Sequence, residues 1–254
     1  MSTAERALEG ENHVVRRGAG PLVLTCEHAG RDVPLELERL GLDDALLDTH
    51  WGWDRWASDA TLRLAAALDV TAVTSRISRL VVDVNRAPDD PTLALARAEG
   101  RPVPGNVDLA PAQVAARVAR WHAPYHAAVD AEVARAVARH GADAVALVSV
   151  HSFTGEWPGQ DRDFDVGVLF DRHADLAGRV LEALAARGLR ARLNEPYSGL
   201  AGLIYAAKRH GDARGVRYVE LELNQHVLEA EAARARVAAA VEGALRAVLL
   251  GGDP

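Results

Sequence analysis

The sequence predicts an α/β protein with a mostly parallel or mixed central sheet that is flanked by helices. Runs rich in Val and Leu alternate along the chain with Ala-rich amphipathic runs, as they do when strands and helices take turns around one sheet. Several of the predicted strands are apolar throughout, which suits strands covered on both faces. The chain has 254 residues, of which 49% are hydrophobic and 26% charged. It can therefore bury one large core, and we expect a single domain over residues 1–254.

The expected elements follow from this alternation and from the turn residues between the runs. Strands are predicted over residues 22–27, 70–77, 80–84, 144–150, 164–170 and 216–223. Helices are predicted over residues 54–68, 111–139, 171–187 and 228–249. Pro124 should kink the second helix, because proline removes a backbone donor. Residues 86–108 contain several prolines and glycines, and we expect an irregular active-site loop or flap there.

Composition and charge exclude several classes of protein. The formal net charge of −7 gives no reason to expect a nucleic acid as partner, because phosphate binding needs a concentrated basic surface. Cys26 is the single cysteine, so an intrachain disulfide and a cysteine-based zinc cage are both excluded. The first twenty residues lack the apolar core of a signal peptide, and no apolar stretch reaches membrane-spanning length. We therefore expect a cytoplasmic protein that binds neither membrane nor nucleic acid.

Chemically active residues gather at the ends of the predicted strands. Glu27 and His28 directly follow the run LVLTC, and His151 follows the run AVALVSV. Ligands of open α/β sheets bind outside the carboxyl ends of the strands, so both histidines are candidate metal ligands. Two histidines and a carboxylate form a three-ligand zinc site that leaves a fourth position for water. The alternative is that each histidine caps a strand end or satisfies a buried hydrogen bond.

The third ligand is less clearly indicated than the two histidines. Asp54 lies in the segment THWGWDRWA, four residues after His50, and the two side chains can share a helix face if the helix begins early enough. Glu27 and His50 are its competitors for this position. Asp54 can also be an ordinary acidic residue in a first helical turn.

The segment SRLVVDVNRAP predicts a binding site for a carboxylate. Arg79, Asn85 and Arg86 lie together there, and a guanidinium holds a carboxylate through two parallel hydrogen bonds. Arg86 is the best anchor, because it ends the strand and opens the flexible loop. The cluster therefore suits an acidic amino-acid substrate, although a structural salt bridge from an arginine to Asp83 would explain the same residues.

Glu222 is the candidate general base. It follows Glu220 by two residues in VELELNQ, so strand alternation puts both acids on one face of the sheet. Burying two acids among Val and Leu is costly unless a cation or a metal-bound water accompanies them. The alternative is an exposed edge strand that carries two solvated acids.

The segments WHAPYH and NEPYSG supply further candidates. His122 and His126 are four apart, but Pro124 between them disturbs the helix that would align them as a zinc pair. We expect them instead to hydrogen-bond to the substrate or behind the site, with His122 as a substrate-binding residue and His126 as a catalytic residue. Either His122 or His126 can stabilise the oxyanion. Tyr197, in NEPYSG, either lines the pocket as a substrate-binding residue or belongs to a simple turn.

Seven segments together resemble the N-formylglutamate amidohydrolase family. They are CEHAGRDVP, THWGWD, SRLVVDVNR, WHAPYH, VHSFTG, NEPYSG and VELELNQ, which occur in the expected order over about residues 21–226. The resemblance implies a fold similar to the zinc-dependent exopeptidases (phosphorylase/hydrolase-like) and hydrolysis of a small N-acyl amino acid. It also implies metal binding by His28 and His151, carboxylate recognition by Asn85 and Arg86, and catalysis by Glu222.

One departure separates this chain from related carboxypeptidase-like and aspartoacylase-like enzymes. Those enzymes use a histidine and a glutamate three residues later as two ligands, whereas His28 is followed at that position by Arg31. The carboxylate ligand must then come from elsewhere, so Asp54 and Glu27 remain rivals. Alternatives for the function are a carboxypeptidase-like enzyme, an N-acyl or N-succinyl amino acid deacylase of other specificity, and a non-catalytic protein that binds a small ligand.

Overall fold

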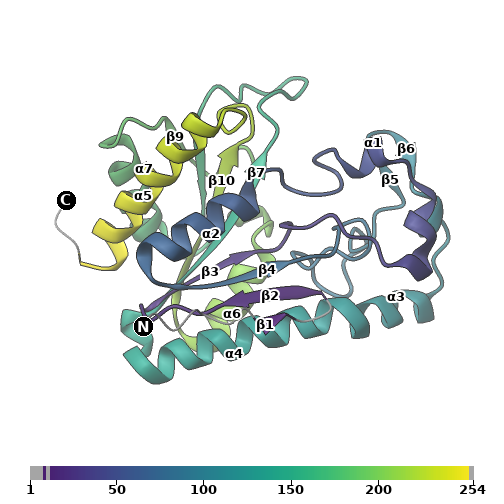
Figure 1. The fold of residues 1–254 in the computed structure, drawn as a ribbon, viewed down its shortest axis with the longest axis horizontal. Coiled ribbons are helices and arrows are strands. Elements are labelled where there is room, and N and C mark those ends of the chain that lie inside the picture. The colour runs from purple at the N-terminus through teal and green to yellow at the C-terminus, as the bar shows by residue number, and fades with distance from the viewer. Residues whose placement is uncertain (1–7, 10–11, 252–254) are drawn as a thin grey trace, which may run out of the picture.

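A mixed eight-stranded sheet forms the centre of the fold, with strands in the order β1-β2-β4-β3-β7-β10-β8-β9 (Figure 1). The computed structural model describes residues 8–9 and 12–251. The strands of this sheet are β1 (Leu8–Glu9), β2 (His13–Arg16), β3 (Leu22–Cys26), β4 (Thr71–Ser75), β7 (Ala146–Phe153), β8 (Val166–Leu169), β9 (Ala191–Leu193) and β10 (Arg217–Asn224). The central strands β4, β3, β7 and β10 run parallel, whereas β2 and β8 pair antiparallel with the two ends of this set. The predicted α/β class with a mixed sheet is confirmed.

Helices cover both faces of the sheet (Figure 1). One face packs against α2 (Ala57–Leu68), α5 (Ala174–Ala185) and α7 (Glu231–Leu249), and the other against α4 (Ala123–His140) and α6 (Tyr205–Arg214). The alternation of side chains divides the core accordingly. Leu22 and Leu24 belong to the cluster beneath α2 and α7, while Val23 belongs to the cluster beneath α4. None of the described helices is both long and apolar enough to cross a membrane.

The helix predicted over residues 111–139 consists of three segments placed end to end. They are α3 (Pro111–Arg117), a π-helical turn (Val118–His122) and α4, which lie along one edge of the protein in Figure 1. The π turn ends just before Pro124, whose ring nitrogen cannot donate a hydrogen bond. The extra residue of a π turn adapts the helix to that missing donor. The disturbance predicted at Pro124 is therefore a π turn that precedes it.

The predicted strand over residues 80–84 is wrong. This apolar run is buried, but it forms turns, and side chains take the place of a neighbouring strand. Asn106 Nδ2 donates to the carbonyl of Leu80 at 2.8 Å, and Arg117 Nη1 donates to that of Val81 at 3.0 Å. Its apolar side chains instead fill a third core cluster, which lies beside the sheet. The apolar run indicated burial correctly and backbone pairing incorrectly.

The third cluster is built by irregular chain. Its segments are the 3-10 helices Leu35–Gly41 and Pro104–Asn106, the short helix α1 (Asp44–Leu47), and the hairpin of β5 (Arg97–Ala98) and β6 (Arg101–Pro102). Leu40, Leu93 and Val103 are among its buried members. The loop expected over residues 86–108 is thus mostly irregular but well packed. Two further 3-10 turns, Ala142–Ala144 and Gly199–Ala201, connect other elements.

On one face of the sheet, the side chains change from apolar to polar along the strands, and the polar ends carry the candidate functional residues. On the side covered by α4 and α6, the three strands β3, β7 and β10 each begin with an apolar residue and end with, or run into, polar ones. These rows are Val23, Thr25 and Glu27 at β3; Leu147, Ser149 and His151 on β7; and Tyr218, Glu220 and Glu222 on β10. Glu220 is in register with Ser149, and Glu222 with His151. A buried polar floor therefore forms at the carboxyl ends of these strands.

Candidate active site

A cavity of about 330 Å³ opens above this polar floor. Most of the residues predicted from the sequence to form a site line it: His28, Asp54, Arg79, Asn85, Arg86, His151, Tyr197 and Glu222. The 86–108 loop contributes Thr92 and Leu95 to the wall, as expected of an active-site loop. The structure therefore brings together segments that lie far apart in the sequence.

Among the described residues, His28, Asp54 and His151 form one group of potential metal ligands. One ligand atom from each residue lies within 4.8 Å of the others, and all three residues are buried. Asp54 does not lie in a helix, because α2 begins only at Ala57. Its position comes from a backbone hydrogen bond, in which Asp54 N donates to the carbonyl of His28 at 2.9 Å. The loop before α2 is thereby tied to the end of β3.

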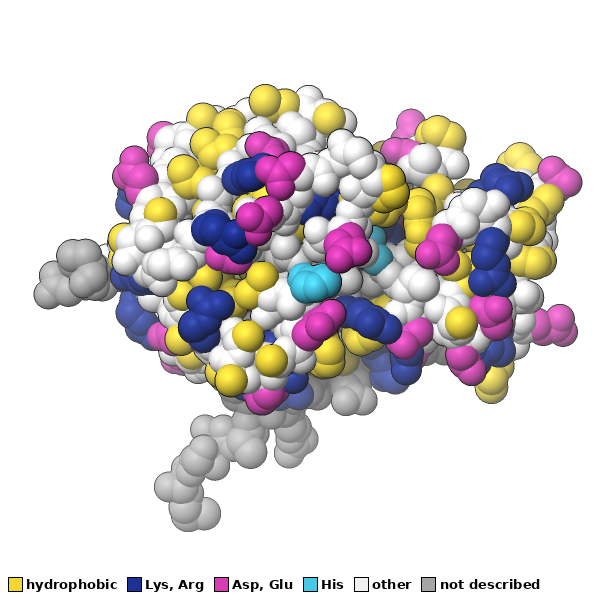
Figure 2. Space-filling view, turned by 90° about the horizontal axis from the view of Figure 1, so that it is seen from above, with side chains coloured by type: hydrophobic (Ala, Val, Ile, Leu, Met, Phe, Trp, Pro, Cys, Tyr) yellow, Lys and Arg dark blue, Asp and Glu magenta, His cyan; other side chains and the backbone are white. Residues whose placement is uncertain are grey.

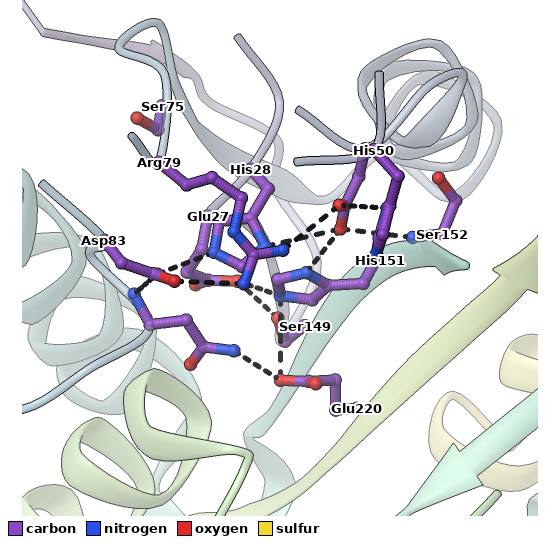
Figure 3. A network of polar contacts seen from close by, with 12 residues as sticks. Glu27, His28, His50, Ser75, Arg79, Asp83, Ser149, His151, Ser152 and Glu220 are labelled. Carbon is purple, nitrogen blue, oxygen red and sulfur yellow. Dashed lines mark hydrogen bonds and ion pairs between the residues drawn. The ribbon is translucent and has the colours of Figure 1, made fainter. Parts of the chain in front are cut away.

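Carboxylates fix the orientation of both imidazole rings. Nε2 of His28 lies 2.7 Å from Oδ1 of Asp83, and Nε2 of His151 lies 2.9 Å from Oε2 of Glu27 (Figure 3). An ionised carboxylate only accepts hydrogen bonds, so both Nε2 atoms carry the proton. By the same argument Nδ1 of His151, which lies 2.8 Å from Oδ2 of Asp54, also carries a proton in this structure. Against the effect of burial, the carboxylates of Glu220, Asp54 and Glu27 raise the pKa of His151 well above its usual value. Nδ1 of His28 instead has no hydrogen-bond partner. Metal-binding histidines are commonly oriented in this way by a carboxylate on their other nitrogen.

The Nδ1 atoms of both histidines face Asp54. Its Oδ2 lies 2.8 Å from Nδ1 of His151 and 3.4 Å from Nδ1 of His28. Nδ1 of His28 and Oδ1 of Asp54 are buried without a hydrogen-bond partner. A zinc ion would take the place of the proton that His151 shares with Asp54, and it would satisfy the two unpaired atoms. These three residues therefore fit a zinc ion by their chemistry and by the atoms they leave unpaired.

The two rival ligands are engaged differently. Glu27 is occupied by hydrogen bonds from Tyr125, Ser149 and His151, so it acts behind the histidine rather than beside Asp54. Nδ1 of His50 approaches Oδ1 of Asp54 to 3.2 Å without completing a hydrogen bond. The geometry thus favours Asp54 over Glu27 as the carboxylate ligand. His50 lies beside Asp54, at the edge of the group formed by His28, Asp54 and His151.

Glu220 and Glu222 lie on the same face of β10, as strand alternation predicts, and both line the cavity. Together with His151 they form a second group of potential ligands. Burial raises the pKa of Glu220 to about 7, and burial with the neighbouring charges of Asp54 and Glu220 raises the pKa of Glu222 well above its usual value. Oε2 of Glu222 is buried without a hydrogen-bond partner. An unpaired carboxylate with a raised pKa is suited to accept a proton.

Acidic groups outnumber basic ones around this floor. Its buried carboxylates are Glu27, Asp54, Asp83, Glu220 and Glu222, and Arg79 is the arginine placed among them. Burying so much negative charge is costly without a compensating cation. A divalent metal ion would supply that charge.

The predicted carboxylate-binding cluster separates into two parts. Arg79 donates to Oδ2 of Asp83 at 3.0 Å, so for Arg79 the salt-bridge interpretation describes the structure. Arg86 donates to the carbonyl of Asn85 at 2.9 Å and to Thr92 at 3.3 Å, and has no acidic partner among the described residues. Oδ1 of Asn85 accepts from the backbone N–H of Ala206 at 2.9 Å, which anchors this turn to α6. Arg86 is therefore the guanidinium of this segment that is available to a ligand.

His122 and His126 do not line the cavity. Nε2 of His122 bonds to the carbonyl of Arg86 at 2.9 Å, so it can act on a ligand only through Arg86. Nδ1 of His126 bonds to Nε2 of His210 at 2.8 Å, and His210 in turn contacts Asp130 at 2.9 Å. Both predicted histidines are packed behind the site on the helix layer. His126 therefore has no part in the mechanism proposed below.

Two further residues of the wall were not predicted from the sequence. Trp157 and Arg162 belong to the loop between β7 and β8, and both line the cavity. The segment EWPGQDRD has the composition of an ordinary polar turn, so nothing in it singled out Arg162. Its position after the strand that carries His151 was the available signal.

Charge on the surface is mixed. Figure 2 shows basic and acidic side chains interspersed over one face of the protein. The described residues of this face form no continuous basic surface of the kind that a phosphate backbone requires.

Two solved structures show how this chain compares with known folds. The gene product Atu2144 of Agrobacterium tumefaciens is 29% identical, with a TM-score of 0.88 over 95% of this chain and 96% of the other. The N-formylglutamate amidohydrolase of Ralstonia eutropha is 20% identical, with a TM-score of 0.63 over 95% of this chain and 99% of the other. At that identity the second comparison supports the fold alone. The chain has no match among the curated proteins.

The sequence profile of a family matches most of the chain. The match covers residues 20–228, from just before β3 to past the end of β10, and so includes every residue that lines the cavity. The chain therefore belongs to the N-formylglutamate amidohydrolase family.

Proposed function

We propose that the protein is a zinc-dependent amidohydrolase that cleaves a small N-acyl acidic amino acid, with N-formylglutamate as the first candidate. The observation that carries this proposal is the arrangement of His28 and His151. Carboxylates hold their outer nitrogens, and their inner nitrogens converge on Asp54 beside the unpaired Glu222. Membership of a family of amidohydrolases supports amide hydrolysis as the reaction.

His28, His151 and Asp54 would hold the zinc ion. The chemistry that zinc supplies when bound is Lewis acidity, which makes water easier to deprotonate and an amide carbonyl easier to attack. Asp83 and Glu27 keep the two imidazole rings in the required tautomer and orientation.

Glu222 moves the proton. It would accept a proton from the attacking water as the water oxygen bonds to the acyl carbon, and then deliver that proton to the nitrogen of the leaving amine. The carbon–nitrogen bond breaks, and the products are a carboxylic acid and the free amino acid. Burial and the neighbouring Glu220 keep the proton affinity of Glu222 high enough for both transfers.

Arg86 would hold the α-carboxylate of the substrate. Its fork of N–H donors matches a carboxylate, and Asn85 fixes the turn from which Arg86 extends. Arg79 acts through Asp83, and Tyr197 contributes its ring to the wall of the cavity. Holding the substrate in register with the reacting groups contributes to the rate as much as the groups themselves.

A zinc-replete screen tests this proposal. N-formyl, N-acetyl and N-succinyl derivatives of glutamate, aspartate and leucine would be assayed for release of the free amino acid. We expect the acidic N-formyl compounds to be the best substrates. A preference for N-acetyl or N-succinyl compounds would indicate a deacylase of other specificity, and no hydrolysis of any compound would favour a non-catalytic ligand-binding protein.

A further inference from the structure

We propose that Arg162 is a second anion-binding residue of this cavity, which holds the side-chain carboxylate of a doubly charged substrate while Arg86 holds the α-carboxylate. This inference rests on the proposed function and extends it from one charged group to two. It assigns a role to a residue of the loop between β7 and β8.

Arg162 is a buried cation with neutral partners only. It is 4% exposed. Its Nε and Nη2 donate to Oε1 of Gln160 at 2.9 and 2.8 Å, and its Nη1 donates to the carbonyl and hydroxyl oxygens of Thr154, both at 2.9 Å. No carboxylate of the described residues lies within ion-pair distance of it. A guanidinium has five N–H donors, so one on Nη2 remains free for a ligand.

Aromatic rings surround the guanidinium. Its central carbon lies 4.9 Å from the ring centroid of Trp157, 5.5 Å from that of Tyr197 and 5.8 Å from that of Phe153. These rings hold the cation in place and exclude water from it. An anion that reaches Arg162 is therefore attracted more strongly than it would be at a hydrated surface.

Burial without a carboxylate is not sufficient evidence by itself, as Arg117 demonstrates. Arg117 is 6% exposed and also binds neutral acceptors, among them the carbonyl of Val81 and Oδ1 of Asn106. It joins two loops and lies away from the cavity. Arg162 differs because it lines the cavity together with Arg86.

The two arginines approach the cavity from different loops, and their neighbours indicate which carboxylate each one meets. Arg86 lies three residues after Asp83, which contacts the metal-site residue His28. Among the contacts of the described residues, Arg162 meets the ring of Tyr197, whose hydroxyl lies 3.3 Å from Nε2 of His50 at the outer side of that centre. The α-carboxylate of an N-acyl amino acid is the one closer to the scissile amide, so it belongs at Arg86. The more distant side-chain carboxylate then meets Arg162.

The test compares N-formyl-L-glutamate with N-formyl-L-glutamine, which has the same shape but no side-chain charge. The zinc-loaded wild-type protein should prefer the acid. In Arg162→Met the ratio of the two kcat/KM values should fall by at least about tenfold, because one charge-assisted contact is lost, while hydrolysis of the glutamine compound changes little. Arg162→Lys keeps the charge without the planar fork and should give an intermediate ratio.

Arg192→Met is the matched control. Arg192 stacks on Phe164 near the same loop and pairs with Asp161 at 3.0 Å, but it does not line the cavity. Its variant should keep the wild-type ratio. Equal loss of activity on both substrates in Arg162→Met, with an unchanged ratio in Arg162→Lys, would make Arg162 a structural brace of its loop and overturn the inference.

Binding measurements separate this inference from the proposed function. If the wild-type protein hydrolyses neither compound, the proposed function fails, and calorimetric titration with L-glutamate and L-glutamine then tests Arg162 alone. Tighter binding of glutamate that is lost in Arg162→Met would support the inference. Equal affinities of the wild-type protein for the two amino acids would overturn it.

Discussion

Two pairs of buried histidines lie in this protein, and they differ in what their nitrogens contact. The rings of His28 and His151 have centroids 4.6 Å apart, and those of His122 and His126 have centroids 4.3 Å apart. In the first pair a carboxylate holds the outer nitrogen of each ring, and the inner nitrogens face a third carboxylate. In the second pair one ring contacts a backbone carbonyl and the other contacts His210.

This difference shows that proximity and burial alone do not make a metal site. A ring nitrogen can bind a metal only if it is unprotonated, and the partner of the opposite nitrogen decides that. In the first pair a carboxylate holds the proton of each Nε2, so that each Nδ1 can serve a metal ion, which at His151 would displace the proton shared with Asp54. In the second pair a histidine bonds to a histidine, which is a stable arrangement for neutral rings. The first pair is therefore the expected ligand pair and the second a structural one.

Replacing one of the proposed metal-binding histidines should have the largest effect on zinc content. His28→Ala and His151→Ala should each lose the zinc ion, because a site with two of three protein ligands binds poorly, whereas His126→Ala should retain about one zinc per chain. Metal content of dialysed protein, measured by plasma emission spectrometry, checks this. Retention of zinc in both ligand variants together with its loss in His126→Ala would reverse the assignment of the two pairs.

Removing the proposed base should reduce turnover without removing metal. Glu222→Gln keeps the shape of the side chain but cannot accept a proton, so kcat should fall by at least ~10² while the zinc content stays unchanged. Glu182→Gln, on the outer face of α5, is a suitable control. Unchanged turnover would leave Glu222 with a structural role, and loss of zinc would make it a ligand.

Replacing Glu27, the carboxylate that bonds to Nε2 of His151, should have a smaller effect on metal binding. Glu27→Gln weakens the acceptor for Nε2 of His151, so we expect zinc affinity to fall by roughly 10- to 100-fold. Competition with a chromophoric chelator measures this. Glu132→Gln is the matched control, because Glu132 is a buried carboxylate paired with Arg17 and Arg135 away from the cavity. Complete loss of zinc, as severe as in His28→Ala, would instead identify Glu27 as a ligand.

The fold and much of the site could be predicted because local sequence determines them. The apolar runs that form β3, β7 and β10 are continuous, and the residues that follow or end them are polar. A parallel sheet places those ends at one edge, so Glu27, His28, His151 and Glu222 could be expected to lie together. The short strands β2 and β9 and the helix α6 were not predicted, because their sequences lack a strong period.

The remaining features depend on contacts between distant segments. The apolar run at residues 80–84 is buried by loops and held by Asn106 and Arg117, so its composition could not reveal that it lacks a neighbouring strand. The choice between Asp54 and Glu27 depended on which side of His151 each one meets. The role proposed for Arg162 depends on aromatic partners from two separate places in the chain, Phe153 and Trp157 beside or within its own loop and Tyr197 beyond β9. Such information exists only in the folded protein.

The smallest expected effect concerns the stability contributed by the second histidine pair. His126 lies in a cluster with His122 and His210, and burial, together with these neighbours, lowers its pKa to about 2. In the unfolded chain the pKa of a histidine is near 6.5. Below that pH the unfolded state binds a proton that folded His126 does not, so the free energy of unfolding falls as the pH falls. Through His126 alone, the free energy of unfolding at pH 5.5 is about 1.4 kcal/mol lower than at pH 8.

Replacing His126 by Leu should remove this dependence. At pH 8 the variant should lose about 1–3 kcal/mol, because buried His210 loses its hydrogen-bond partner, while zinc content and turnover stay unchanged. Between pH 8 and 5.5 its free energy of unfolding should then fall less steeply than that of the wild-type protein. Urea unfolding at both pH values measures the two slopes, with His140→Leu as control, because His140 is only partly buried and bonds to the carbonyl of Ala19. Parallel slopes for His126→Leu and wild type would show that His126 is protonated in the folded protein, and the contrast between the two histidine pairs would then need another explanation.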